Sequence, residues 1–469
     1  MCYFLRYSIQ VSTERLSINI VEMIAKTMCQ LRSIAFWFLD AINGRVVKNA
    51  YHELKTFDAL DSNSKRLTEH QQLALQKLLQ KAIDTTRFYG KIERNCLADF
   101  PIVNKNIIRK QQDDFISGKY DKSKLFVRNT CGSTGAPFIC YQNSVKKKRV
   151  NAEVIYYSGK AGYSVGRNLI YLSSSSQEKY KSKLSQWIKN EILLDINNLD
   201  NEKIERLLSN IYKASHSGSM IKVYASTLDA WRDYFRRKGI SVAGKGRIYG
   251  IVSGAEMLFD DTRDAVSRIF HCRCFSRYSN QENGIIGQDD TENNVFILNE
   301  AHYLVEIFKM DADESAAEGE VGRIVVTDLY NYAMPMIRYD TGDIGSIVYI
   351  ERDGVNKKAI TNFGGRRVDM VFDCYGNRLS PHSAMIDYKL FPEIKQYQFI
   401  QENKTQYTVK INADKEFVRQ KEIKAFLQRM LGDKAVINIE MVEEKPVLAS
   451  GKRKYIVNKM LSDVKGNEN

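Results

Sequence analysis

The chain lacks the features of a secreted, disulfide-linked protein. Its eight cysteines are scattered over 469 residues, and no signal peptide with a small-residue cleavage site is evident near the start. Thiols stay reduced in the cytoplasm, so scattered cysteines fit that compartment. We therefore expect a cytoplasmic protein without disulfide bonds.

The sequence also lacks a clear zinc site. His271, Cys272 and Cys274 lie close together, but the Cys-x-Cys falls in an alternating apolar run. A structural zinc site needs a second pair of ligands at a matching spacing, and none is present. We therefore favour ordinary packing over metal binding at these residues.

Apolar stretches near the start are short and interrupted by charges. The run Ser33 to Ile42 is too short to cross a bilayer. An amphipathic helix here would either pack on the protein's own core or rest on a membrane surface as a peripheral contact. Its aromatic residues and neighbouring cations are Phe36, Trp37, Phe38, Arg32 and Arg45.

The chain has fewer acidic than basic residues. The chain has 70 Lys and Arg against 56 Asp and Glu, a net charge of +14, which favours an anionic partner such as a nucleotide, coenzyme A or an anionic lipid surface. The run Lys146 to Arg149 is typical of a nucleic-acid patch, but it opens a helical pattern and lacks interleaved aromatic residues. We expect a solvated helix face there and no nucleic-acid binding.

A kinase-type phosphate loop is missing as well. Such a loop ends in Gly-Lys-Ser or Gly-Lys-Thr, whereas Gly135 is followed by Ala136. Instead, Gly132 and Gly135 bracket two hydroxyl residues in the run Thr130-Cys131-Gly132-Ser133-Thr134-Gly135-Ala136-Pro137. Glycines adopt positive φ freely, so neighbouring N–H groups can point at one anion. The run predicts a phosphate-binding loop, although a run of this kind, taken alone, is more often an ordinary turn.

Further motifs follow in a fixed order. They are Ser253-Gly254-Ala255-Glu256, Arg277-Tyr278-Ser279-Asn280-Gln281-Glu282, Met336-Ile337-Arg338-Tyr339-Asp340-Thr341-Gly342-Asp343, Gly364-Gly365-Arg366-Arg367-Val368-Asp369 and Ser450-Gly451-Lys452. This order resembles the adenylate-forming superfamily, and above all its phenylacetate–CoA ligase-like branch with the capsular polysaccharide biosynthesis proteins of CapK type. Gln71 to Phe88 and Leu97 to Lys105 resemble that branch's opening helix and its Leu-x-x-x-Pro-Ile-x-x-Lys motif.

The resemblance implies a nucleotide site. The phosphate loop, with Thr130, Gly132, Ser133, Thr134 and Gly135, would hold the β- and γ-phosphates of ATP. Gly254, Ala255 and Glu256 would lie along the adenine edge, and Tyr278 would stack on the base. Asp343 would accept both ribose hydroxyls, because an ionised carboxylate offers two acceptor oxygens. Arg366 would assist it, or Arg367 if the register slips by one.

The resemblance also implies the catalytic groups. A carboxylate and the α-phosphate of ATP repel each other, so the site must neutralise charge and align the attack. Lys452 would contact both anions, and we expect its loss to cost about 2 to 4 kcal/mol of transition-state stabilisation. Glu282 matches the magnesium-linked glutamate, a hard oxygen ligand, and Thr134 would act with these two residues.

Several positions depart from the family pattern. Phe138 stands where relatives often carry a lysine, Ser279 and Gln281 replace a glycine and a threonine, and Val368 replaces an aspartate. Asn280, Gln281 and Val368 leave a second hypothesis open, a non-catalytic protein that keeps the fold for binding or scaffolding in polysaccharide assembly. The retained Glu282, Asp343 and Lys452 argue against it.

Periodicity and breakers predict the organisation. From about residue 71 to 360, apolar strand-like runs alternate with helical stretches, which predicts an α/β core. The strands are expected at Leu169 to Leu172, Ile221 to Tyr224, Arg247 to Val252 and Ile324 to Val326, and helices at Glu202 to Ala214 and Leu228 to Lys238. A smaller α+β unit follows, with strands at Gln396 to Ile400, Tyr407 to Ile411 and Val436 to Val442 and a helix at Lys415 to Met430.

These observations predict an α/β enzyme with a large N-terminal adenylate-forming domain and a smaller α+β C-terminal cap. We place a helical extension at residues 1–53, the AMP-binding domain at 54–364 and the cap at 365–469. The expected reaction joins a small-molecule carboxylic acid to AMP and then to an acceptor, with ATP, Mg²⁺ and coenzyme A as cofactors. A sugar or a separate carrier is the alternative acceptor.

Overall fold

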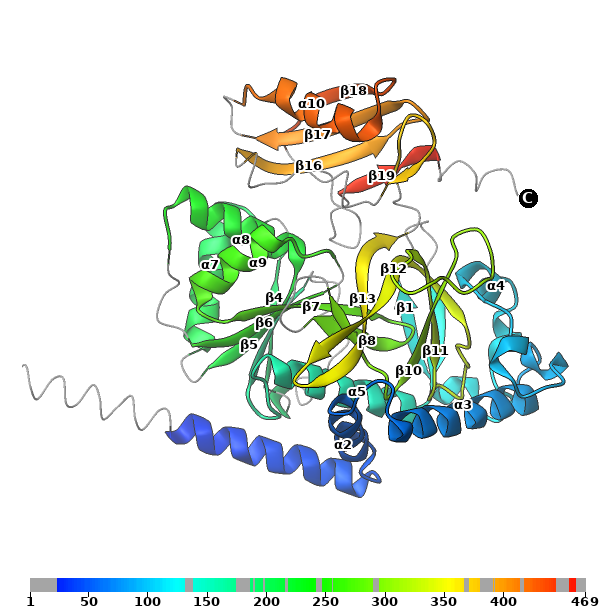
Figure 1. Ribbon diagram of the computed structural model, residues 1–469. Coiled ribbons are helices and arrows are strands. Elements are labelled where there is room, and N and C mark those ends of the chain that lie inside the picture. The colour runs from blue at the N-terminus through cyan, green and yellow to red at the C-terminus, as the bar shows by residue number, and fades with distance from the viewer. Residues whose placement is uncertain are drawn as a thin grey trace, which may run out of the picture. The chain divides into compact units, whose positions relative to one another are not determined.

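The structure is a computed structural model of the chain (Figure 1). It describes residues 23–130, 138–173, 186–188, 190–196, 199–215, 218–241, 247–254, 256–289, 295–366, 371–379, 391, 393–413, 417–443 and 455–460. The chain divides into two compact units. Unit 1 comprises Met1–Glu53, Lys148–Gly254 and Thr262–Phe275, and unit 2 comprises Leu54–Lys147, Ala255–Asp261 and Ser276–Asn469.

Unit 1 contains a parallel sheet flanked by helices. Its strands run in the order β6-β5-β3-β4. Strand bounds are Asn168–Ser173 for β3, Glu191–Asp195 for β4, Ser219–Tyr224 for β5 and Ile248–Gly254 for β6. The predicted strands at Leu169, Ile221 and Arg247 are confirmed, because uninterrupted apolar runs are typical of parallel strands buried on both faces.

The helices of unit 1 follow from their apolar spacing. In α7 the buried residues Ile204, Leu207, Leu208 and Ile211 recur at helical intervals. Asp200 caps this helix by accepting the N–H of Lys203 at 2.7 Å. Helices of unit 1 include α2 at Val46–Asp58, α5 at Ser144–Lys160, α7 at Asn201–Ala214, α8 at Ala225–Arg237 and α9 at Asp260–Phe270. Of these, α2, α5 and α9 also have residues in unit 2.

Unit 2 contains an antiparallel sheet in the order β10-β11-β12-β13-β9-β8-β7. The bounds are Arg273–Asn280 for β7, Gly284–Asp289 for β8, Phe296–Leu298 for β9, Tyr303–Phe308 for β10, Gly322–Asp328 for β11, Tyr339–Arg352 for β12 and Val355–Arg366 for β13. Strand β11 confirms the strand predicted at Ile324. Asp353 and Gly354 both have positive φ, +52° and +77°, which is the conformation that a tight β12–β13 hairpin requires.

A second part of unit 2 packs around the hairpin of β1, Phe126–Thr130, and β2, Phe138–Gln142. The helices α3, Lys65–Thr85, and α4, Lys105–Lys110, lie nearby in the chain. One cluster of fully buried side chains joins these elements to the start of β12. It includes Leu78, Tyr89, Phe100, Val103, Phe115, Phe138, Met336 and Tyr339. This core fixes the stem of the predicted phosphate loop against β12.

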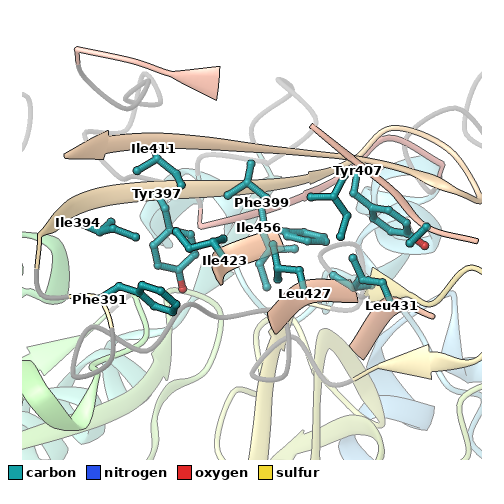
Figure 2. Packing of buried hydrophobic residues seen from close by; sticks show 14 of the residues in the cluster. Phe391, Ile394, Tyr397, Phe399, Tyr407, Ile411, Ile423, Leu427, Leu431 and Ile456 are labelled. Atoms are coloured by element: carbon teal, nitrogen blue, oxygen red, sulfur yellow. The ribbon is translucent and has the colours of Figure 1, made fainter. Parts of the chain in front are cut away.

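The C-terminal part is a small α+β fold with its own core (Figure 2). Strands β16, Ile394–Gln401, β17, Gln406–Ala413, β18, Val436–Met441, and β19, Ile456–Asn458, form a sheet in the order β18-β17-β16-β19. A short hairpin of β14, Val371–Phe372, and β15, Arg378–Leu379, precedes it. The three strands predicted here are confirmed. The core includes Phe391, Tyr397, Phe399, Tyr407, Ile423, Leu427 and Leu431.

The predicted C-terminal helix starts too early. Helix α10 spans Gln420–Leu431 rather than beginning at Lys415. Phe417 is buried and Val418 is exposed in the non-helical residues just before it. Gly432 ends the helix with φ of +92°, a conformation that side chains other than glycine rarely adopt.

Within the described residues, no helix combines the length and the apolar character that crossing a membrane requires.

Candidate active site

The start of β12 anchors the candidate site. Arg338 has φ of +47°, an uncommon conformation for a residue with a side chain. Its guanidinium holds this conformation through an ion pair with Glu306 at 2.9 Å. Its backbone N–H donates to the hydroxyl of Thr327 at 3.0 Å. The chain therefore enters β12 in a fixed direction.

The next residues of β12 are fixed in turn. Asp340 forms an ion pair with Arg323 at 3.3 Å and accepts the N–H of Gly342 at 2.8 Å. Thr341 donates its hydroxyl to the carbonyl of Ile324 at 3.0 Å. Because every one of these groups is buried or half-buried, the strand cannot rotate without breaking several hydrogen bonds.

Tyr278 and Asp343 lie together. The Tyr278 hydroxyl donates to Asp343 Oδ2 at 3.0 Å and lies 3.3 Å from the Thr341 hydroxyl. The Tyr278 ring packs against Phe363 with centroids 4.7 Å apart, within a buried apolar cluster. Burial and, next, the charge of Asp343 raise the pKa of Tyr278 well above its usual value, so the phenol stays protonated. Two residues predicted for base and ribose therefore share one hydrogen bond.

Arg366 stands opposite Asp343 in the sheet. The β12–β13 register pairs these two residues directly. The strand containing Arg366 thus runs past the predicted ribose carboxylate, and Arg367 lies outside the described residues.

Glu282 lies in the turn between β7 and β8 and is almost fully buried, with 2% of its surface exposed. Its Oε1 is 2.6 Å from the ammonium of Lys105 and accepts the hydroxyl of Tyr339 at 3.1 Å. Gln142, at the end of β2, donates to the backbone carbonyl of Glu282 at 3.2 Å. The predicted metal ligand is therefore linked both to β12 and to the stem of the predicted phosphate loop.

Lys105 reaches Glu282 because its backbone is tied to β12. Val103 bridges to Tyr339, donating its N–H to the Arg338 carbonyl at 3.0 Å. Asn104 caps α4 by accepting two backbone N–H groups, which places Lys105 at the first position of that helix. Its ammonium also lies 5.6 Å from the centre of the Phe138 ring. A lysine ammonium thus lies beside the position where relatives often carry a lysine.

A buried ion pair is connected by hydrogen bonds to the β7–β8 turn that contains Glu282. Lys146 and Asp328 are fully buried and lie 2.7 Å apart. Lys146 also donates to the Tyr303 hydroxyl at 3.0 Å, which in turn donates to the carbonyl of Asn283 at 2.8 Å. Breaking such a pair leaves an uncompensated buried charge, so this network is expected to hold the turn rigidly.

The prediction of a solvated face for the basic run is wrong. Lys146 is 0% exposed, Lys147 lies over the Phe126 ring at 3.6 Å, and Arg149 forms an ion pair with Glu53 at 2.7 Å. The partners come from distant parts of the sequence, which a local charge pattern does not reveal.

Most of the other predicted site residues lie outside the described residues. Ala255, Lys452, Val368 and residues 131–137, with most of the phosphate loop, lie outside the described residues. Thr130 ends β1 opposite Phe138 at the base of that loop. Gly254 ends β6 in unit 1, whereas Glu256 belongs to unit 2.

Sequence reasoning missed two residues, Lys105 and Tyr339. Both stand within motifs that carry the family resemblance, but neither was given a role. Their shared contact with Glu282 depends on the β12 fold rather than on spacing. The sequence did contain a signal. Lys105 ends the Leu-x-x-x-Pro-Ile-x-x-Lys motif, where an ordinary surface lysine is not expected.

The donor set suits a nucleotide-bound Mg²⁺ only in part. Mg²⁺ in such sites is held by one or two carboxylates, water and substrate phosphates, and Glu282 supplies one buried carboxylate. Its Oε1 already contacts the Lys105 ammonium. In the parts of the chain that the structure describes, no group of three or more acidic, His or Cys side chains could hold a metal; His271, Cys272 and Cys274 form no such group.

Comparison with known proteins supports the resemblance to CapK-type proteins and adenylate-forming ligases. Residues 383–459 match the CapK C-terminal domain. Over 441 residues the chain is 22% identical to Protein CapK of Staphylococcus aureus, covering 88% of this chain and 93% of that protein. The resemblance to CapK-type proteins is confirmed. A 129-residue stretch, 27% of this chain, is 31% identical to 28% of a phenylacetate-coenzyme A ligase of Thermus thermophilus.

Solved structures agree on the fold. A 2-hydroxyisobutyryl-CoA ligase in its postadenylation state, in complex with 2-HIB-AMP, matches with a TM-score of 0.68 at 13% identity, over 86% of this chain and 92% of that one. The same ligase with 2-HIB-AMP and CoA in its thioesterification state matches with a TM-score of 0.53 at 14% identity, over 87% and 93%. The chain therefore has the fold of the adenylate-forming ligases, with a large N-terminal domain and a smaller C-terminal domain.

Proposed function

We propose that this protein is an ATP-dependent ligase that activates a carboxylic acid as an acyl adenylate and passes the acyl group to coenzyme A. One observation carries the proposal: Tyr278, Asp343, Glu282 and Lys105 converge on the first residues of β12 within an adenylate-forming fold. Their types suit a nucleotide, because they combine a hydroxyl-binding carboxylate with a paired acid and cation.

In the proposed first step, a carboxylate oxygen of the acid attacks the α-phosphorus of ATP. The bond from that phosphorus to the bridging oxygen breaks, and pyrophosphate leaves with the electron pair. Lys452 is proposed to contact the carboxylate and the α-phosphate as charge moves between them. Residues of the 130–135 loop are proposed to hold the outer phosphates through backbone N–H groups and the hydroxyls of Ser133 and Thr134.

Within the described part of the site, the chain's own residues orient the nucleotide. Asp343 is proposed to accept the ribose hydroxyls while Tyr278 fixes its orientation through the 3.0 Å hydrogen bond. Gly254, Ala255 and Glu256 are proposed to line the adenine edge, and Arg366 to assist Asp343. A bound Mg²⁺ would neutralise phosphate charge beside Glu282. Lys105 is proposed as the positioning residue that orients the Glu282 carboxylate through their 2.6 Å contact.

In the proposed second step, the thiolate of coenzyme A attacks the acyl carbon and AMP leaves. The 2-hydroxyisobutyryl-CoA ligase structure with CoA and the phenylacetate-coenzyme A ligase match support this acceptor. The similarity to Protein CapK supports a role in capsule or surface polysaccharide assembly, where a sugar or carrier is the alternative acceptor. Because the reaction needs ATP and a reduced thiol, its proposed place is the cytoplasm. We propose domains at 1–53, 54–364 and 365–469.

A binding-only protein is the second candidate. It is favoured by the contact of Lys105 with Glu282 Oε1, which competes with a metal. It is also favoured by the β7–β8 turn, where Asn280 and Asn283 are hydrogen-bonded to each other and Ser279 replaces the glycine of relatives. Such a protein would bind ATP without releasing pyrophosphate.

The experiment that separates the two candidates is pyrophosphate release from ATP and Mg²⁺ over a panel of aryl, fatty, amino and sugar acids, with and without coenzyme A. The parent is compared with Lys452→Ala and with Lys421→Ala, an exposed lysine of α10 that serves as the control. Release that depends on one acid and drops about 100-fold or more in Lys452→Ala alone supports adenylation. ATP binding without release for every acid supports the second candidate.

A further inference from the structure

The helix formed by residues 23–42 presents an apolar face to solvent. This is the long blue helix that precedes α2 in Figure 1. Seven large apolar side chains on it expose between 45% and 67% of their surface. They are Met23, Ile24, Leu31, Ile34, Phe38, Leu39 and Ile42. At about 100° per residue they fall on one face roughly 160° wide.

The opposite face of this helix is fixed on unit 1. The loop at Gly166 approaches the backbone of Cys29 so closely that an added Cβ would lie 2.2 Å from its carbonyl oxygen. Asp40 accepts the N–H groups of Val47 and Lys48 at 3.0 and 2.9 Å, which joins the end of the helix to α2. The apolar face is therefore held outward by packing on the other side.

The exposed charged residues of the segment 23–52 are all cationic. Four cationic residues lie among residues 23–52: Lys26, Arg32, Arg45 and Lys48. Three of them are exposed and Arg32 is half-buried. The single carboxylate in that range, Asp40, is buried. An apolar stripe edged by cations complements an anionic lipid surface, whose headgroups attract Lys and Arg while its acyl boundary accepts apolar side chains.

An exposed tryptophan stands beside the helix. Trp187 exposes 53% of its surface, and the Arg32 guanidinium lies 5.3 Å from its ring centre. Tryptophan combines an apolar ring with a polar N–H and is enriched at the boundary between lipid and water. Phe38 and Trp187 thus give the surface two aromatic groups of the kind found at that boundary.

We propose that the face made by Met23, Ile24, Leu31, Ile34, Phe38, Leu39 and Ile42 binds the surface of an anionic bilayer, with the helix lying in the membrane plane. A second copy of the chain is a poorer occupant, because a two-fold interface would bring the same cations of both copies together. This proposal concerns a surface outside the candidate active site and does not depend on the ligase reaction.

The test is flotation of the full chain with vesicles of phosphatidylglycerol and phosphatidylcholine, and with vesicles of phosphatidylcholine alone. The parent should float with the anionic vesicles and bind neutral ones at least about tenfold more weakly. A triple variant, Leu31→Ser, Ile34→Ser and Phe38→Ser, should lose at least about tenfold in binding. Leu73→Ser, at an exposed leucine of α3, is the matched control and should bind as the parent does.

Charge reversal tests the electrostatic half of the proposal. Lys26→Glu with Arg45→Glu should weaken anionic binding about tenfold or more, with unchanged circular dichroism and thermal midpoint. The proposal is overturned if the parent does not float with anionic vesicles, or if the triple variant floats equally well. It is also overturned if sedimentation shows that the parent is a dimer, that the triple variant is a monomer, and that the dimer does not bind vesicles.

Discussion

At the scale of single residues, the candidate site consists of buried polar groups that satisfy one another. Lys105 neutralises Glu282, Tyr278 donates to Asp343, and Lys146 pairs with Asp328. Removing one partner of a buried pair costs about 3–5 kcal/mol because the other charge stays buried and alone. Removing both partners costs much less. Double substitutions therefore separate the structural role of a pair from its role in chemistry.

Lys105→Met should reduce kcat/KM for pyrophosphate release by about 100-fold and lower the thermal midpoint, because the buried Glu282 carboxylate loses its cation. The double variant Lys105→Met, Glu282→Gln should recover most of the thermal stability and none of the activity. Steady-state kinetics and thermal unfolding of both variants check this. Recovery of activity in the double variant would contradict a role for Lys105 in positioning Glu282.

Tyr278→Phe should weaken ATP binding about fivefold to tenfold, because the hydroxyl that orients Asp343 is lost while the ring stays in its apolar cluster. Calorimetric titration with ATP measures the effect. Tyr375→Phe is a matched control, since its hydroxyl also donates to an aspartate, Asp433, but on an exposed surface. Equal effects of the two substitutions would show that the Tyr278–Asp343 bond has no part in nucleotide binding.

At the scale of elements, long β12 and β13 organise unit 2. One end of the β12–β13 pair carries Asp343 opposite Arg366. Toward the other end, Lys357 of β13 donates to the carbonyls of Asp58, the last residue of α2, and Leu60. Glu300 lies in the same neighbourhood and accepts a hydrogen bond from the Ser62 hydroxyl. This end of the sheet is where a pH effect on stability is expected.

Burial raises the pKa of Glu300 to about 7, against the opposing effects of Ser62 and Lys358. The folded chain therefore binds this proton more tightly than the unfolded chain does. The stability that protonated Glu300 contributes is complete below the unfolded pKa of this group, near 4.5, and is lost as pH rises through the folded pKa of about 7. The free energy of unfolding should fall by on the order of 1 to 3 kcal/mol across that window.

Urea unfolding of the parent and of Glu300→Gln at a series of pH values measures this slope. The variant should show a flatter dependence between the two pKa values, because its side chain no longer titrates. A parent whose stability rises through the same window, or a variant with an unchanged slope, would contradict the assignment to Glu300.

Prediction from the sequence succeeded where local pattern decides structure. Uninterrupted apolar runs identified the parallel strands β3, β5 and β6, and helical spacing identified α7. Prediction failed where the structure depends on contacts between residues that are far apart in the sequence. The burial of Lys146 depends on Asp328, and the pairing of Lys105 with Glu282 depends on the bridge from Val103 to Tyr339. The sequence therefore predicted which residue types occur and in which order, but it did not predict which of these residues contact one another.

At the scale of the whole molecule, the C-terminal part has a core of its own, separate from the buried clusters of the N-terminal part. Leu427→Ala removes a fully buried side chain from it and should destabilise that part by about 2–5 kcal/mol. Calorimetry should show one transition shifted down and another unchanged. Leu208→Ala in unit 1 should move the other transition, and a single transition shifted by both variants would contradict separate cores.

The central claim is that a carboxylate oxygen attacks the α-phosphorus of ATP. The most direct measurement uses the active acid labelled with ¹⁸O in its carboxylate, followed by mass spectrometry of the products after turnover with coenzyme A. The account predicts AMP that carries one ¹⁸O and pyrophosphate that carries none, because the attacking oxygen stays on the α-phosphorus when the thiol displaces AMP. Label in inorganic phosphate, formed together with ADP, would contradict it.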